Sequence, residues 1–145
     1  MAASKFLSDS DKSLLIKEIE SAELNTSGEI RVHIESKCNS DPISRAITVF
    51  NALKMYRTKE RNAVLIYIAY ESKKLAIIGD AGINSTVPEG FWDDVKDVLV
   101  SHFASNQIVD GLRIAIRMTG DKLRDYFPHK TDDTNEQSNE ISFGE

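Results

Sequence analysis

An uninterrupted apolar run near the middle of the chain constrains the fold more than any other sequence feature. Residues 63–70 read Ala-Val-Leu-Ile-Tyr-Ile-Ala-Tyr. A short run of this kind, without alternation and rich in β-branched and aromatic residues, predicts a strand that other elements cover on both faces. It is far shorter than the roughly 20 apolar residues that span a bilayer. We therefore expect it to lie at the centre of a layered α/β protein.

The segments around this run predict further strands and helices. Residues 29–35 alternate apolar and polar side chains, which predicts a strand with one buried face. The short polar turn at 71–74 predicts an antiparallel hairpin between the central strand and the next one. Expected strands cover 29–35, 64–69 and 75–78, and expected helices cover 9–23, 42–57, a segment that begins at Pro88, and a segment that ends before Pro128.

The order of these elements predicts an α/β fold, namely a three-layer α/β/α sandwich with a small mixed β-sheet flanked by helices on both faces. The helix between the first two strands predicts that these strands are parallel and joined by a right-handed crossover. A length of 145 residues fits about one domain. We expect residues 6–128 to form that domain.

The negative charge is concentrated at the carboxyl end of the chain. The formal net charge is −5, and residues 128–145 hold five acidic residues against one lysine. Only Ile141 and Phe143 could bury apolar surface there, so we expect residues 129–145 to be a disordered acidic tail. The body before the tail is nearly neutral, which argues against binding to nucleic acid.

The single cysteine, the scattered histidines and the first residues of the chain argue against several classes of protein. Cys38 is the single cysteine, so the chain can form neither an internal disulfide nor a cysteine-based zinc site, and its polar loop predicts an exposed thiol. His33, His102 and His129 fall on different elements, where we expect surface or partly buried side chains. The first residues do not resemble a secretory signal. We expect a soluble, cytoplasmic monomer without a membrane span.

The predicted topology gathers oxygen-bearing side chains at one edge of the sheet. The start of strand 29–35, the start of strand 64–69 and the end of strand 75–78 share that edge, which brings Glu29, Asn62 and Asp80 together. Carboxylate and amide oxygens suit a hard cation, so these residues are the predicted ligands of Ca²⁺ or Mg²⁺. The alternative is purely structural, with Asp80 capping a turn and Glu29 pairing with Arg61.

Six spaced motifs also carry a family resemblance. They are Thr26-Ser27-Gly28-Glu29-Ile30-Arg31-Val32, Arg61-Asn62-Ala63-Val64-Leu65-Ile66-Tyr67-Ile68-Ala69, Ala76-Ile77-Ile78-Gly79-Asp80-Ala81-Gly82-Ile83, Trp92, Gly111-Leu112 and Tyr126-Phe127-Pro128. Together they resemble the TPM domain family, named for a thylakoid lumen protein, a photosystem II repair protein and a membrane modulator of acetylcholine receptors. The resemblance implies a three-layer α/β/α fold, divalent cation binding in some members and acid phosphatase activity in some. It also implies Glu29 and Asp80 as candidate ion ligands.

The residues offer few other routes to phosphoester chemistry. Cys38 and Arg45 are too far apart for a cysteine-dependent phosphatase loop, and no glycine lies between them. An aspartyl-phosphate enzyme needs an Asp-x-Asp pair after a strand, whereas Asp9 and Asp11 precede a predicted helix. A metal-assisted reaction would use Glu29 and Asp80, with Arg61 or Lys59 holding the phosphate.

These observations leave three hypotheses. The leading one is a TPM-type domain that binds a divalent cation at Glu29, Asn62 and Asp80 and acts as a binding or accessory module. The alternative is a weak, metal-dependent acid phosphatase that hydrolyses phosphomonoesters at the same residues, so enzymatic activity stays open. The third is a scaffold whose acidic tail recruits a basic protein partner.

Overall fold

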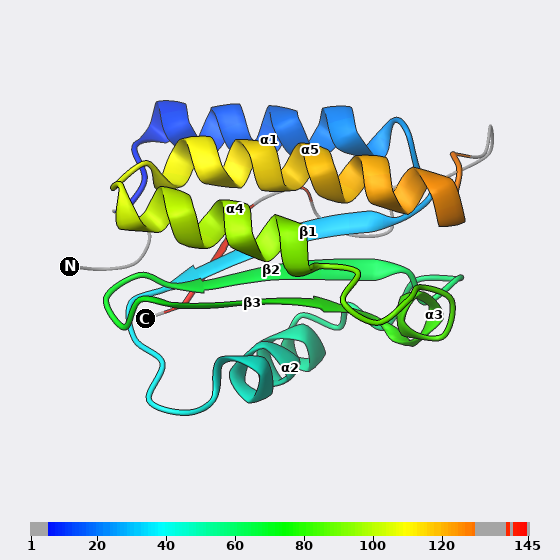
Figure 1. Cartoon of the computed structure of the whole chain (residues 1–145), viewed down its shortest axis with the longest axis horizontal. Helices are drawn as coiled ribbons and strands as arrows, with labels where there is room; N and C mark the ends of the chain where they lie inside the picture. Colours follow the sequence, from blue (N-terminus) through cyan, green and yellow to red (C-terminus); the bar gives the residue numbers. More distant parts are fainter. Residues whose placement is uncertain (1–5, 130–138, 140, 145) are drawn as a thin grey trace.

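A mixed β-sheet separates two layers of helices (Figure 1). The structure is a computed structural model that describes residues 6–129, 139 and 141–144. Its strands, in chain order, are β1 (Glu29–Glu35), β2 (Ala63–Ala69), β3 (Lys74–Gly79) and β4 (Ser142–Phe143). Across the sheet they lie in the order β3-β2-β1-β4, so β2 and β1 occupy the interior.

The helices are divided unequally between the two faces of the sheet. One face is covered by α1 (Asp9–Glu23), α4 (Asp93–Ala104) and α5 (Ile108–Tyr126), whereas α2 (Pro42–Ala52) covers the other. The short α3 (Ala81–Asn84) directly follows β3. The predicted three-layer α/β/α sandwich with a mixed sheet is therefore confirmed.

Strand register defines two edges that matter for function. β1 and β2 are parallel, with Glu29 opposite Ala63 and Glu35 opposite Ala69. β3 runs antiparallel to β2, as the short hairpin predicts. The amino-end edge of the sheet therefore holds the starts of β1 and β2 and the end of β3, at the right of Figure 1. The carboxyl-end edge holds the ends of β1 and β2.

Side chains of β2 alternate between two hydrophobic cores, and every residue of the strand is buried. The larger core lies beneath α1, α4 and α5 and receives Val64, Ile66 and Ile68. The smaller core lies against α2 and receives Leu65 and Tyr67. Two-sided burial is the property that the uninterrupted apolar run predicts.

Local side-chain contacts start the first two helices. The Ser8 hydroxyl accepts a hydrogen bond from the amide of Asp11 at 3.1 Å, and the Asp11 carboxylate accepts one from the Ser8 amide, forming a capping box. Asp41 caps α2 by accepting from the amide of Ser44 at 3.0 Å, and Pro42 occupies the first helical position. The predicted starts of both helices are confirmed.

Two helix boundaries differ from the predictions. The helix predicted over 42–57 ends at Ala52, and Lys54 then adopts a φ of 56°, which a helix cannot continue through. The helix predicted from Pro88 begins at Asp93, because Gly90 adopts a φ of 77°. Apolar spacing extends beyond both helices, since residues in turns also pack against the core.

The end of the chain contributes one strand that the sequence does not predict. Ser142 and Phe143 pair with β1 as β4, and Ile141 is buried in the larger core. Residues 141–144 therefore differ from the disordered tail expected over 129–145. Residues 130–138, 140 and 145 of that expected tail lie outside the described part of the chain. No helix among the described residues is long and apolar enough to cross a bilayer.

Candidate functional site

The amino-end edge of the sheet holds the three predicted ligand residues. Glu29 lies opposite Ala63, Asn62 directly precedes Ala63, and the amide of Asp80 donates to the Ala63 carbonyl oxygen at 2.9 Å. All three side chains are buried, with exposures of 4% for Glu29, 1% for Asn62 and 6% for Asp80. The topology thus places Glu29 at the start of β1, Asn62 just before β2 and Asp80 just after β3, at one edge of the sheet.

Asp80 is already engaged by neighbouring groups. Arg61 donates two hydrogen bonds to its carboxylate, from Nε at 2.6 Å and from Nη2 at 2.9 Å. The amide of Ala81 donates a third at 2.7 Å, which caps α3. The ion pair raises the pKa of Arg61. Asp80 therefore caps a turn, as the purely structural alternative predicts. That alternative paired Arg61 with Glu29, whereas Arg61 forms its ion pair with Asp80.

The loop around Asp80 packs against the Arg61 backbone. Gly82 donates from its amide to the Arg61 carbonyl oxygen at 2.9 Å. A Cβ atom at position 82 would lie 2.1 Å from the Glu60 carbonyl oxygen, so only glycine permits this approach. The arrangement positions Asp80 for the ion pair with Arg61.

Asn62 carries an unsatisfied polar atom. Its Nδ2 donates to Ser27 Oγ at 3.3 Å, and Ser27 Oγ in turn donates to the Glu60 carboxylate at 3.0 Å. Its Oδ1 is buried and accepts no hydrogen bond from the described residues. A buried amide oxygen without a donor destabilises the folded state by about 1–3 kcal/mol, which makes it a candidate for an additional ligand.

A second carboxylate lies against Glu29, and the sequence analysis missed it. Glu23, in the last turn of α1, accepts a hydrogen bond from the Ile30 amide at 2.8 Å and contacts the Glu29 carboxyl group. Burial and the neighbouring Glu29 raise the pKa of Glu23 to about 9. The two carboxyl groups therefore resist carrying two negative charges at neutral pH.

The acidic groups at this edge form a pair rather than a larger cluster. Among residues 6–129, 139 and 141–144, no three Asp, Glu, His or Cys side chains are arranged so that they could hold a metal ion. Any cation at this edge would need amide, backbone or water oxygens to complete its coordination.

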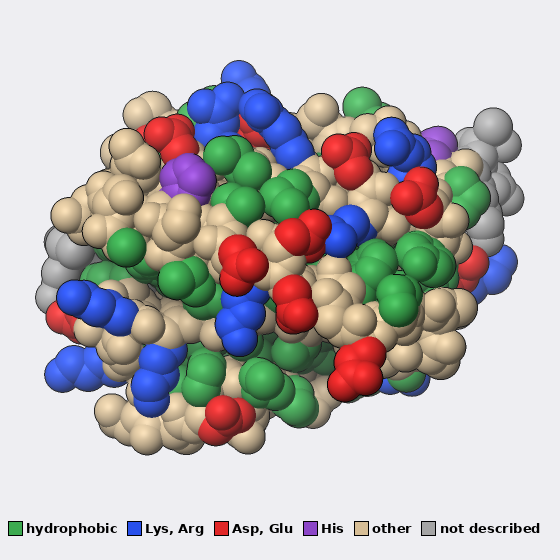
Figure 2. All heavy atoms as spheres, in the orientation of Figure 1, with side chains coloured by type: hydrophobic (Ala, Val, Ile, Leu, Met, Phe, Trp, Pro, Cys, Tyr) green, Lys and Arg blue, Asp and Glu red, His purple; other side chains and the backbone are tan. Residues whose placement is uncertain are grey.

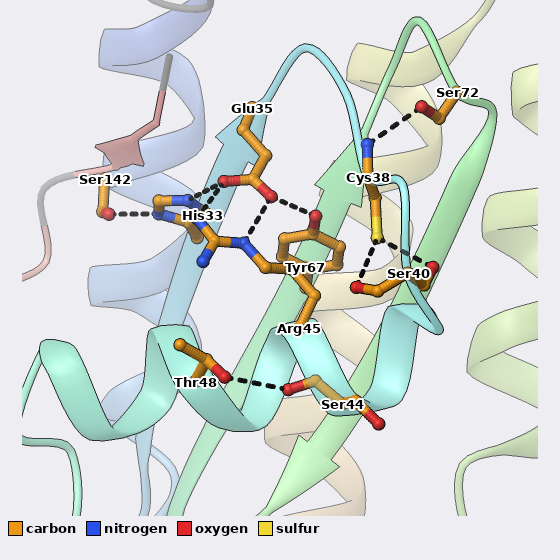
Figure 3. Close-up of polar contacts among 10 residues, drawn as sticks. All are labelled: His33, Glu35, Cys38, Ser40, Ser44, Arg45, Thr48, Tyr67, Ser72 and Ser142. Carbon is orange, nitrogen blue, oxygen red and sulfur yellow. Dashed lines mark hydrogen bonds and ion pairs between the residues drawn. The ribbon is translucent and has the colours of Figure 1, made fainter.

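The carboxyl-end edge holds a buried polar network that the sequence analysis did not single out (Figure 3). Glu35 lies at its centre and receives Arg45 Nε and Nη2, each at 2.8 Å. Its carboxylate also accepts from the Tyr67 hydroxyl, and His33 Nε2 lies 3.2 Å away. We call Glu35, Arg45, Tyr67 and His33 the Glu35 cluster.

Charge within the Glu35 cluster is compensated. Burial alone would raise the pKa of Glu35, but hydrogen bonds from Arg45, Tyr67 and His33 outweigh it and hold that pKa at about 2. Burial lowers the pKa of His33, which favours the neutral ring. Burial, followed by the Glu35 and Cys38 contacts, raises the pKa of Tyr67. At neutral pH the cluster therefore contains one carboxylate and one guanidinium.

Cys38 lies beside this cluster and is buried, so the predicted exposed thiol is wrong. Its Sγ donates to the Ser40 carbonyl oxygen at 3.2 Å, and its amide donates to Ser72 Oγ at 2.9 Å. Lys74 Nζ donates to the Cys38 carbonyl oxygen at 3.1 Å. These contacts fix the loop that borders a surface hollow of about 640 Å³ next to Arg45.

The polar side of β1 explains why the Glu35 cluster was missed. Alternation in residues 29–35 predicts that Glu29, Arg31, His33 and Glu35 face solvent, whereas Glu29, His33 and Glu35 are buried. A signal for this burial exists in the sequence, because Tyr67 is the one polar-tipped residue within the otherwise apolar segment 63–69. Such a hydroxyl needs a buried hydrogen-bond partner.

Charged side chains are interspersed on the face of the molecule shown in Figure 2. Lys and Arg side chains lie among Asp and Glu side chains and apolar patches, without forming one continuous basic area on this face. Some of the charged side chains on the surface form ion pairs, such as Lys122 with Asp94 at 3.0 Å.

Comparisons with known proteins give a family and two similar structures. A family model described as the TPM domain matches residues 2–122. The BA42 protein of the psychrophilic bacterium Bizionia argentinensis, solved by NMR, is 43% identical, with 96% of each chain covered and a TM-score of 0.90. The N-terminal domain of the cg2496 protein of Corynebacterium glutamicum is 14% identical, and its TM-score is 0.57 over 96% of this chain and 80% of that one. The second likeness shows the fold alone. No curated protein matches the chain.

The Glu23 and Glu29 pair predicts an unusual pH dependence of stability. A carboxyl group whose folded pKa is raised to about 9 stabilises the protein below its unfolded pKa of about 4.3, and this contribution is lost as the pH rises toward 9. In buffer that contains a chelator, the free energy of unfolding of the wild type should therefore fall with rising pH, by an amount that approaches about 1.4 kcal/mol per pH unit. Glu23→Gln should remove this fall. Urea unfolding from pH 4 to 9 measures it. The exposed Glu89→Gln, which lies outside the groups that shift the Glu23 pKa, is the control. Parallel curves for Glu23→Gln and wild type would contradict the prediction.

The Glu35 cluster predicts a large effect of one arginine. Arg45→Ala leaves the Glu35 carboxylate buried without its cation, so the free energy of unfolding at pH 7 should fall by roughly 3–5 kcal/mol. The double variant Glu35→Gln/Arg45→Met should recover most of this loss. As control, Arg124→Ala removes an exposed pair with Asp121 and should change stability by less than about 1 kcal/mol. Urea unfolding tests both, and equal effects of the two arginines would refute the assignment.

Proposed function

This chain belongs to the TPM domain family, and we propose that it acts as a binding module that takes a divalent cation, Ca²⁺ or Mg²⁺, at the amino-end edge of the sheet. The proposed ligands are the carboxylates of Glu29 and Glu23 and the Oδ1 of Asn62. Asp80, predicted from sequence as a ligand, has its carboxylate engaged by Arg61 and Ala81. We therefore assign Asp80 to the border of the proposed site.

The contact between the Glu23 and Glu29 carboxyl groups carries this proposal. A buried carboxylate (Glu29) and a half-buried one (Glu23) in contact repel one another unless a proton or a cation lies between them. A divalent cation satisfies both at once, and carboxylate oxygens are the ligands that Ca²⁺ and Mg²⁺ prefer. The pair is held in place because Glu23 accepts from the Ile30 amide, while Glu29 begins β1.

The buried Oδ1 of Asn62 supports the same reading. It is an oxygen acceptor on the residue that directly precedes β2, the strand next to Glu29, and no described group donates to it. The Asn62 carbonyl oxygen accepts from the Glu29 amide at 3.3 Å, so the two residues are adjacent in the ladder. Amide oxygens complete many Ca²⁺ sites in which carboxylates are few. With two carboxylates, we expect weak binding, with a Kd of roughly 10⁻⁴–10⁻³ M.

Calcium titration followed by residue-resolved NMR tests the site. We expect amide shifts at residues 23 and 28–30 and at Asn62, because the ligand oxygens are attached to these segments. Glu29→Gln should weaken binding at least tenfold, and Glu23→Gln should do so as well. Asp80→Asn should lower stability but change the Kd by less than about threefold.

The controls separate this site from the acidic carboxyl end. A full-length variant in which Asp132, Asp133 and Glu136 are changed to Asn, Asn and Gln keeps the amino-end edge intact. It should bind calcium with the wild-type Kd. Shifts confined to residues beyond 129, or a Kd that Glu29→Gln leaves unchanged, would sink the proposed site.

Phosphomonoester hydrolysis is the alternative, and the same residues provide less for it. A metal-assisted phosphatase needs cationic groups free to hold the phosphate, and Arg61 is paired with Asp80. We expect no chelator-sensitive hydrolysis of p-nitrophenyl phosphate above a heat-inactivated control. Activity that disappears in Glu29→Gln and in EDTA would instead establish the phosphatase.

A further inference from the structure

The outer edge of β1 is covered by a short segment from the far end of the chain. Ser142 lies opposite His33 and Phe143 lies opposite Ile34, in a parallel arrangement. The amide of Gly144 donates to the Ile34 carbonyl oxygen at 2.9 Å. Without this segment, the backbone groups of β1 on this side would form an open edge, which is a template for adding another strand.

Each residue of the segment meets a specific partner on the body. Ile141 is buried in the larger core, and Phe143 packs against that core. The ring of Phe143 also lies under Lys12 Nζ, which is 5.1 Å from the ring centroid. Ser142 Oγ hydrogen-bonds with His33 Nδ1 at 2.5 Å (Figure 3). The edge therefore distinguishes side chains at three successive positions.

The fourth position admits only glycine. A Cβ atom at residue 144 would lie 2.6 Å from Glu35 Oε1, 2.8 Å from Glu35 Cβ and 3.1 Å from His33 Nε2. Glu35 cannot move away easily, because Arg45 and Tyr67 hold its carboxylate. The Glu35 cluster thus limits the space beside the outer edge of β1 at position 144.

The segment is short enough to depend on its covalent tether. Two paired residues and a few side-chain contacts form a minimal strand, which is marginal on its own. Residues 129–140 connect it to Pro128, which pairs with Thr26 just before β1. Twelve residues can span at most about 40 Å, whereas the seven residue steps from Thr26 to His33 span roughly 23 Å. The number of connecting residues therefore suffices to join Pro128 to the segment, and the covalent link makes docking of residues 141–144 an intramolecular event.

We propose that the outer edge of β1 is a docking groove for an extended segment of a partner protein that reads aliphatic–Ser–aromatic–Gly, and that residues 141–144 are a tethered occupant which such a segment displaces. The partner strand adds in parallel to β1, so backbone hydrogen bonds give affinity and the side-chain contacts give selectivity. The glycine of the partner lies against Glu35 and His33.

Peptide binding to the full-length chain tests the groove. The probe is the acetylated peptide Asn-Glu-Ile-Ser-Phe-Gly-Glu, and the opened variant is full-length Phe143→Ala/Gly144→Val, labelled with ¹⁵N. We expect the amide signals of residues 32–36 to shift in the opened variant and to return toward wild-type positions as the peptide is added. The peptide should bind the opened variant at least tenfold more tightly than wild type, in which the tethered segment competes.

A matched peptide with valine in place of its glycine is the control, and it should bind at least tenfold more weakly. If the opened variant is poorly folded by circular dichroism, Ser142→Ala serves in its place with a smaller expected gain. Unchanged β1 signals in the opened variant, or no peptide binding to it, would overturn the proposal. A wild-type dimer that becomes monomeric in the opened variant would also overturn it, because a second copy would then supply the occupant.

Discussion

Burial of β2 on both faces is the constraint on which the rest of the structure depends. Alternate residues of this strand enter two different cores, so neither the α1, α4 and α5 layer nor the α2 layer can be removed without exposing apolar side chains. Because helices cover both faces of β2, a ligand can reach the sheet only at its margins. The two candidate sites accordingly lie at the amino-end edge and at the carboxyl end of β1.

The neighbouring strand β1 carries polar residues into the smaller of these two layers. Glu35 and His33 point toward the α2 side, where Arg45 supplies the compensating charge from α2 itself. Since a buried carboxylate needs its cation, the position of α2 is tied to the end of β1. The same fixed carboxylate then limits which residue can occupy position 144. The ion pair between Glu35 and Arg45 thus helps to define the outer edge of β1, against which residues 141–144 pack.

Sequence periodicity predicts the elements whose positions are decided by apolar burial. The helix at 9–23, the parallel pair β1 and β2 and the β2–β3 hairpin are confirmed on that basis. Contacts between distant segments are harder to predict from the sequence, because they depend on tertiary packing. Glu23 ends a helix whose capping signals lie at its other end, so nothing local indicates that it meets Glu29. Likewise β4 is a two-residue strand in a polar segment, and its stability comes from the edge it covers.

The two ends of β1 differ in how their carboxylates are balanced. Glu35 at one end has a guanidinium, a hydroxyl and an imidazole as partners, and its pKa of about 2 reflects a completed network. Glu23 beside Glu29 at the other end has a pKa of about 9, because burial and the adjacent Glu29 carboxyl group both disfavour its charged form. A completed network favours one rigid geometry, which suits recognition of a peptide by shape. An incomplete one gains stability from an added positive charge, which suits ion binding. Five residues of β1 lie between Glu29 and Glu35, and the proposed ion site and the groove share no side chain, so we expect the ion and the peptide to bind independently.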